Sequence, residues 1–186
     1  MRRTTKTHSQ TITELLTEGV WYAEGHTHRV VELVLHNADL FDELMECLLS
    51  ADNGTSKRAA MALELVSERQ PTWFTPYKEI LLDELAEQPR WYVVYRLCMI
   101  LPRLSLNQQE WRRAVERLRE LVESSRIVVS VSALSGLAML TLPPHSTDIE
   151  LREEVTWLVE QKMRVGSKAM QARGRHLLPK LYSAKA

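Results

Sequence analysis

The feature that most constrains this chain is a helix-start signature that recurs along it. Thr11, Ser105 and Thr147 each stand three residues before Glu or Gln, which is the spacing of a capping box. Pro76 directly after Thr75 indicates a fourth start, because proline at the first helical position loses no intrahelical hydrogen bond. Apolar residues follow these starts at helical spacing, so each segment has one face to bury. The sequence therefore predicts an all-α protein.

The β-branched run over residues 127–131 is the one stretch that resembles a strand. It continues into further apolar residues at helical spacing, so we predict that it is a buried helix. The connections between segments are short and polar, and consecutive helices should therefore pack as antiparallel neighbours. The ten predicted helices cover roughly residues 10–20, 28–36, 38–50, 55–69, 76–87, 90–103, 106–124, 126–141, 148–163 and 167–181.

Four of these segments resemble one another and align at Ala60, Tyr95, Ala133 and Ala172, with spacings of 35, 38 and 39 residues. This is the period of a two-helix repeat. TSKRAAMALELV and SRIVVSVSALSGLAML resemble the first helix of a HEAT repeat. The order of RW at residues 90–91, SR at residues 125–126 and GSKAMQARGRHLLPKL at the end is similar to short bacterial HEAT-like proteins of unassigned function. The resemblance implies an α–α superhelix of about four to five stacked antiparallel hairpins with a surface that binds other proteins. The predicted organisation is an N-terminal tail over residues 1–9, one HEAT-like domain over residues 10–181 and a C-terminal tail over residues 182–186.

Composition disfavours several classes of protein. The formal net charge is zero, so no overall field attracts the chain to nucleic acid or to anionic membranes. The longest strongly apolar run, Leu97 to Leu101, is far shorter than the roughly 20 residues of a membrane span. The two cysteines, Cys47 and Cys98, are too few for a disulfide framework, and the basic N-terminus is not followed by the apolar run of a secretory signal. We therefore expect a cytoplasmic protein that binds no membrane and for which nucleic acid is a disfavoured partner.

A cluster of histidines and carboxylates invites a metal-binding hypothesis. It comprises Glu24, His26, His28, Glu32 and His36. In a helix His28 and Glu32 share a face, but His36 lies two turns beyond His28 and no fourth ligand is anchored elsewhere. A solvated surface is therefore the preferred interpretation, and whether His26, His28 and His36 bind metal stays open. HEAT-repeat metal hydroxylases bind iron through paired His-Glu dipeptides, and this sequence has no such dipeptide.

No other catalytic signature was found in the sequence. It contains no nucleophile elbow and no glycine-rich phosphate loop. HEAT-like DNA glycosylases use aromatic side chains in a concave groove, but four of the five tryptophans here fall on apolar stripes or at a turn. The five are Trp21, Trp73, Trp91, Trp111 and Trp157. We therefore predict that the chain is not an enzyme and has no catalytic residue, cofactor or metal site.

The distribution of charge along the chain is the strongest functional signal. Residues 11–50 hold eight acidic side chains against Arg29, whereas residues 161–186 hold seven basic side chains and no acid. The candidate partner-binding residues are Arg164, Lys168, Arg175 and Lys180. We predict a non-catalytic protein–protein interaction or scaffold module whose second helices line a shallow concave surface that engages another protein. We also hypothesise that the basic end docks an acidic partner. The alternatives are a weak head-to-tail homo-oligomer, nucleic-acid or anion binding through the same end, and a HEAT-type enzyme without a recognisable motif.

Overall fold

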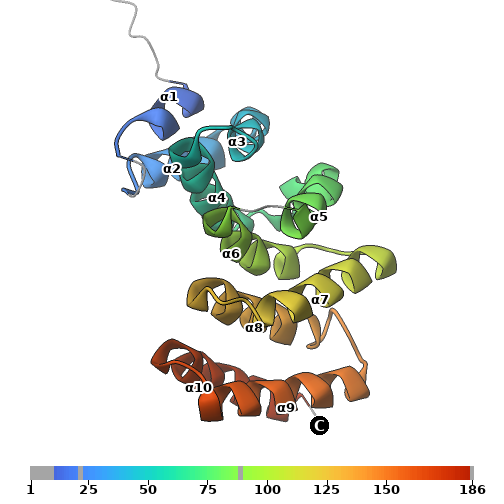
Figure 1. Cartoon of the computed structure of the whole chain (residues 1–186). Helices are drawn as coiled ribbons and strands as arrows, with labels where there is room; N and C mark the ends of the chain where they lie inside the picture. The colour runs from blue at the N-terminus through green and yellow to red at the C-terminus, as the bar shows by residue number, and fades with distance from the viewer. Residues whose placement is uncertain (1–10, 21–22, 88–89, 185–186) are drawn as a thin grey trace, which may run out of the picture. The chain divides into compact units, whose positions relative to one another are not determined.

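The computed structural model describes residues 11–20, 23–87 and 90–184 (Figure 1). This part of the chain contains ten α-helices, three short 3₁₀ segments and no strand, so the all-α prediction is confirmed. Each predicted helix is present, whereas the tail predicted over residues 1–9 lies outside the described residues. The α-helices are α1 (Ile12–Thr17), α2 (Thr27–His36), α3 (Phe41–Leu48), α4 (Asn53–Ser67), α5 (Lys78–Glu87), α6 (Trp91–Ile100), α7 (Gln108–Val122), α8 (Ile127–Leu140), α9 (Ile149–Val165) and α10 (Lys168–Ser183).

Of the helix starts predicted at Thr11 and at Pro76, the structure confirms the first and shifts the second. The capping box at the start of α1 is confirmed, because the Thr11 side chain accepts from the Glu14 N–H and the Glu14 carboxylate accepts from the Thr11 N–H. The start predicted at Pro76 is early by two residues. Pro76 lies inside a 3₁₀ segment, η2 (Pro71–Tyr77), and α5 begins at Lys78.

The other two predicted caps, Ser105 and Thr147, are wrong. The α7 helix begins after Asn107, whose side chain accepts hydrogen bonds from the first turn while the Glu110 carboxylate accepts the Asn107 N–H. The α9 helix begins after Asp148, whose carboxylate accepts from the N–H three residues later. Asparagine and aspartate cap helices at least as well as serine and threonine. In both cases the cap is the candidate residue that directly precedes the first helical residue.

The helices divide into two compact units, Met1–Val66 and Ser67–Ala186. In unit one the core includes leucines from several helices, such as Leu15, Leu44 and Leu63, which are fully buried. A charged side chain is buried among them, since Arg58 of α4 is only 1% exposed. Its guanidinium donates to the carbonyl oxygens of Leu16 at 2.5 Å and Val20 at 3.2 Å.

Arg58 donates hydrogen bonds to carbonyl groups at and just beyond the C-terminal end of α1. The last carbonyl groups of a helix have no partner within that helix, and the guanidinium supplies donors for them. Two glycines give the side chain room, because a Cβ at Gly25 or at Gly54 would lie 3.1 Å or 2.7 Å from Arg58 atoms. Gly25 also has a φ of +55°, which favours glycine. Burial lowers the pKa of the Arg58 guanidinium, and the Asp52 carboxylate partly opposes this effect.

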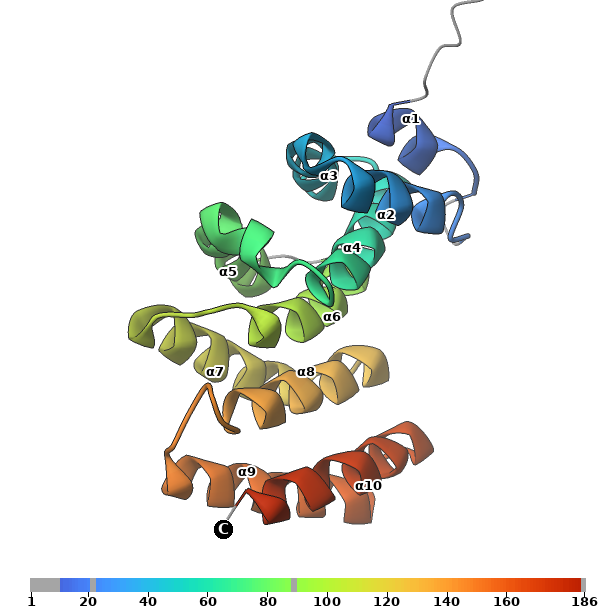
Figure 2. The same cartoon turned by 180° about the vertical axis from the view of Figure 1, so that it is seen from behind.

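In unit two the helices form three consecutive antiparallel pairs, α5–α6, α7–α8 and α9–α10 (Figures 1 and 2). The helices α6, α8 and α10 pack side by side in one layer, and α5, α7 and α9 follow one another in the second. The approach of α8 to α6 is close, because a Cβ at Gly136 would overlap the carbonyl oxygen of Cys98. Ala133, one of the repeat positions, is fully buried in α8.

No helix in the described ranges of the chain has both the length and the apolar character that crossing a bilayer requires.

Candidate protein-binding surface

The two helix layers of unit two differ in charge. The segments α6, α8 and α10 contain no aspartate or glutamate at all, whereas α5, α7 and α9 together contain eleven acidic and eight basic side chains. The basic residues of the first layer, including the one that precedes α8, are Arg96, Arg126, Lys168, Arg173, Arg175 and Lys180. We call this set of helices the acid-free layer. Its cations have no carboxylate on their own helices to neutralise them.

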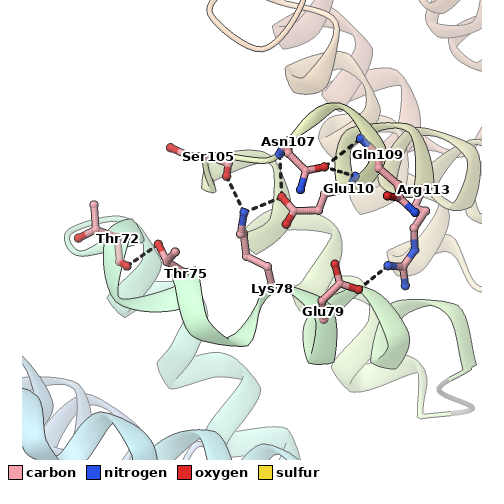
Figure 3. Close-up of polar contacts among 9 residues, drawn as sticks. All are labelled: Thr72, Thr75, Lys78, Glu79, Ser105, Asn107, Gln109, Glu110 and Arg113. Carbon is pink, nitrogen blue, oxygen red and sulfur yellow. Dashed lines mark hydrogen bonds and ion pairs between the residues drawn. The ribbon is translucent and has the colours of Figure 1, made fainter.

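In the other layer several acids form ion pairs with neighbouring bases. The first is a largely buried pair between α5 and α7, which we call the Lys78–Glu110 latch (Figure 3). Lys78 Nζ donates to Glu110 Oε2 at 2.6 Å and to the carbonyl oxygen of Ser105 at 3.0 Å. Burial alone would raise the pKa of the Glu110 carboxyl. The hydrogen bonds from Lys78 and from the Asn107 N–H outweigh burial and hold this pKa below its usual value. The latch therefore keeps the Glu110 carboxylate charged at the contact between α5 and α7.

More exposed ion pairs continue across the same layer. Arg113 of α7 binds Glu79 at 2.5 Å and Asp83 at 2.7 Å, both on α5. Arg119 of α7 binds Glu154 of α9 at 2.9 Å. Each exposed pair contributes only about 0–1 kcal/mol to stability. Their main effect here is that the paired charges are neutralised within this layer.

Three hollows of about 270, 510 and 570 Å³ open on the α5–α7–α9 side, and adjoining hollows share residues of α7 such as Trp111 and Glu116. Their walls mix acids and bases. Trp111 has a structural role, since its indole N–H donates to the carbonyl oxygen of Leu140 at 3.1 Å. Burial lowers the pKa of His145 at the rim, but the hollow places no nucleophilic side chain in a hydrogen bond with its ring. We therefore do not assign these hollows a catalytic role.

The histidines considered as metal ligands each contact a different partner. His26 Nε2 lies 3.0 Å from the Glu18 carboxylate, and His36 Nδ1 lies 2.7 Å from the carbonyl oxygen of Glu32. His28 Nε2 is 3.9 Å from the Glu24 carboxylate. Within the described residues no group of three or more His, Cys, Asp or Glu side chains is arranged to hold a metal ion.

On the acid-free layer, aromatic rings and arginines meet where α6 and α8 begin. The Trp91 and Tyr95 rings stack with centroids 6.2 Å apart. The Arg126 guanidinium lies 5.3 Å from the Trp91 centroid, and the Arg96 guanidinium lies 4.6 Å from the Tyr95 centroid. A guanidinium over a ring is held by cation–π attraction. Arg126 is exposed, so its peripheral N–H groups can still bind a planar anion such as a carboxylate.

Exposed aliphatic side chains lie next to this cluster in sequence. Ile127 is 56% exposed and Val128 is 39% exposed, at the first turn of α8. Arg126 is itself exposed and pairs with no carboxylate in the ranges that the structure describes. We call the set formed by Trp91, Tyr95, Arg96, Arg126, Ile127 and Val128 the α6–α8 patch.

The four residues predicted to bind a partner are all exposed. Lys168 and Arg175 lie on one line of α10, because seven residues span nearly two turns. Lys180 is about 140° away from Arg175 around the helix and lies on the same line as Arg173. Arg164 belongs to α9 instead. The four cations are therefore distributed over two flanks of α10 and the end of α9.

The sequence alone does not reveal the α6–α8 patch, because Trp91 falls on or near an apolar helical stripe and such a position predicts a core side chain. The ring is half-buried and supports Arg126. Trp157 was given the same interpretation, yet it is 60% exposed on α9. Trp21 lies outside the described residues. The signal that could have found the patch is the complete lack of acid in residues 90–103 and 124–147.

Comparisons with protein-family models, with curated proteins and with solved structures returned no match to this chain.

Proposed function

We propose that this chain is a non-catalytic protein-interaction module that binds an acidic protein through the acid-free layer. The observation that carries the proposal is the complete lack of aspartate and glutamate in α6, α8 and α10, combined with exposed cations on that layer. Within the helix pairs of unit two, all the acids lie in α5, α7 and α9, so the layer formed by α6, α8 and α10 has a local positive field. Such a field favours an anionic partner and sets its orientation.

The proposed architecture is a HEAT-like helical repeat with a superhelical arrangement. It is supported by the 35 to 39 residue spacing of similar helices and by the three stacked antiparallel pairs of unit two. In repeat proteins each helix pair buries its apolar face only against its neighbours. The outer face of a layer is therefore free to vary in sequence and to bind a partner.

A protein partner fits the surface better than nucleic acid. Exposed ion pairs contribute only about 0–1 kcal/mol each, so a stable complex also needs apolar contact. Ile127 and Val128 offer such contact beside the cations. Phosphate binding depends on many cations at once, and the zero net charge gives the whole chain little general affinity for a polyanion.

Nucleic-acid or anion binding through α10 is the second candidate. It is favoured by the exposure of Lys168, Arg175 and Lys180 on a helix without any acid. Binding of this kind would weaken steeply with salt, because each neutralised phosphate releases a counterion.

The test is affinity capture from the native cell with the full chain and two matched variants. One variant reverses Lys168, Arg175 and Lys180 to Glu, and the control reverses three exposed arginines outside the acid-free layer, Arg29, Arg69 and Arg112. Both variants change the net charge equally. We expect a stoichiometric acidic protein with the parent and the control, and its loss with the α10 variant. The proposal is wrong if no protein is captured, or if nuclease treatment releases what is captured.

A further inference from the structure

We infer that the α6–α8 patch is the docking site for an acidic segment of the partner protein, in which carboxylates alternate with aliphatic side chains. This inference rests on the proposed function and names the chemistry of the partner. Three features at one place in the fold carry it: an exposed arginine, Arg126, that pairs with no carboxylate among the described residues, the Trp91 ring that supports this arginine, and exposed aliphatic side chains.

Arg126 provides the charged half of the site. Its guanidinium is positioned over Trp91, whose ring is itself stacked on Tyr95, so less side-chain freedom is lost when an anion binds. No acid on α6, α8 or α10 competes with a partner for it. A carboxylate matches the planar donor edge of the guanidinium with two parallel hydrogen bonds.

The first turn of α8 provides the apolar half. Ile127, Val128 and the half-buried Val131 fall within about 100° of one another around the helix. A purely acidic chain or a nucleic-acid backbone would leave these side chains in water. A segment that carries both carboxylates and aliphatic side chains covers both halves, because burial of the apolar surface also favours binding.

The experiment is fluorescence anisotropy with the full chain and three labelled probes. The first is a helical peptide of about 16 residues with Glu and Leu at i, i+4 spacing, the second has Lys in place of each Glu, and the third is an oligothymidylate of similar length. We expect the acidic peptide alone to bind. Arg126→Glu should weaken its binding by about tenfold or more, since that corresponds to about 1.4 kcal/mol.

Two further variants make the result specific. Arg112→Glu places the same charge change at an exposed arginine on α7 and should alter binding less than about twofold, because rim charges remote from a contact are screened. Ile127→Ser should weaken binding without changing its salt dependence. Circular dichroism of each variant verifies folding, and Arg126→Gln replaces Arg126→Glu if the reversal disturbs the helix.

The outcomes separate the two proposals. Binding of the oligothymidylate in place of the peptide, or equal effects of Arg126→Glu and Arg112→Glu, overturns the docking site. If the native partner is captured equally well by Arg126→Glu and by the parent, the docking site is wrong while the interaction function stands. If the native cell yields no protein partner, the interaction function itself is wrong.

Discussion

Arginines that donate to backbone carbonyls recur along this chain. Arg58 binds the end of α1, and Arg152 is similarly buried, at 4% exposed. The Arg152 guanidinium donates to the carbonyl oxygens of Thr141 at 3.2 Å and Ala184 at 2.5 Å, at the ends of α8 and α10. A cation at a helix C-terminus also interacts favourably with the helix dipole. Single residues therefore fasten the ends of helices that are distant in sequence.

The first prediction concerns Arg58. Arg58→Met should lower the free energy of unfolding by about 2–4 kcal/mol, because it leaves buried carbonyl groups without donors. Arg69→Met removes the same charge from an exposed site of unit two and should change stability by less than about 0.5 kcal/mol. Urea denaturation followed by circular dichroism measures both. Equal stability of the two variants would show that the Arg58 hydrogen bonds contribute nothing.

The second prediction concerns pH and the Lys78–Glu110 latch. The folded-state pKa of Glu110 is below its usual value, so its charged form stabilises the fold above the unfolded pKa of about 4.3. This contribution is lost as pH falls through the lower, folded pKa. Between pH of about 5 and 3 the parent should lose more stability than Glu110→Gln, as measured by urea denaturation at each pH. Parallel pH profiles of the two proteins would contradict the role of the latch.

At the residue scale, some helix caps and buried contacts could be predicted from the sequence and others could not, for physical reasons. The Thr11 box was predictable because a cap is a local interaction. Ser105 was wrong as a cap because Asn107, two residues later, can cap as well, and only the folded geometry selects Asn107. The role of Arg58 depends on carbonyls about 40 residues away, and local patterns carry no information about such contacts.

At the scale of the helices, the third prediction concerns the crossing of α8 over α6. Gly136→Ala places a methyl group against the rigid backbone at Cys98, so it should cost about 1–3 kcal/mol although alanine favours helix more than glycine does. Gly174→Ala is the matched control. Its neighbour is the flexible Met163 side chain, which can move, and the loss should be less than half as large.

Thermal unfolding of both variants, followed by circular dichroism, provides the comparison. A Gly136→Ala protein that is more stable than the parent would show that only helix propensity operates at this position and that the two helices can separate without cost.

The helices themselves were the most predictable feature. Apolar spacing found all ten, including α8, whose start is rich in β-branched residues. Their starts were less predictable, as Pro76 shows, because a 3₁₀ turn can precede the regular helix without changing the pattern.

At the scale of the whole molecule, the fourth prediction uses the two buried thiols, Cys47 in unit one and Cys98 in unit two. Burial raises the pKa of Cys98 to about 12 and also raises the pKa of Cys47. Neither thiol should react with a thiol reagent at pH 8 until its unit opens, because the thiolate is the nucleophile. Unit one is the smaller and should open first.

Single-cysteine variants, Cys98→Ala and Cys47→Ala, make the two rates separable. With rising urea we expect labelling of Cys47 to begin at a lower concentration than labelling of Cys98. Identical urea dependence in the two variants would show that the whole chain unfolds as one cooperative unit.

The candidate surface was predictable only in part. The contrast between acidic residues 11–50 and basic residues 161–186 was visible because it follows the order of the sequence. The second asymmetry runs between layers, and it appears only when α6, α8 and α10 are known to lie side by side. Trp91 and Arg126 likewise come together through helix packing, 35 positions apart along the chain.

The arginine contacts to backbone carbonyls have a consequence for how this sequence can change over time. Every amino acid supplies a carbonyl, so Leu16, Val20 and Thr141 can be replaced freely as far as these hydrogen bonds are concerned. Only the donor residue is restricted. Among descendants of this chain, Arg58 and Arg152 should be retained while the residues that supply the carbonyl acceptors change. Methods that infer contacts from correlated substitutions should therefore detect no coupling between these arginines and the helix ends that they bind.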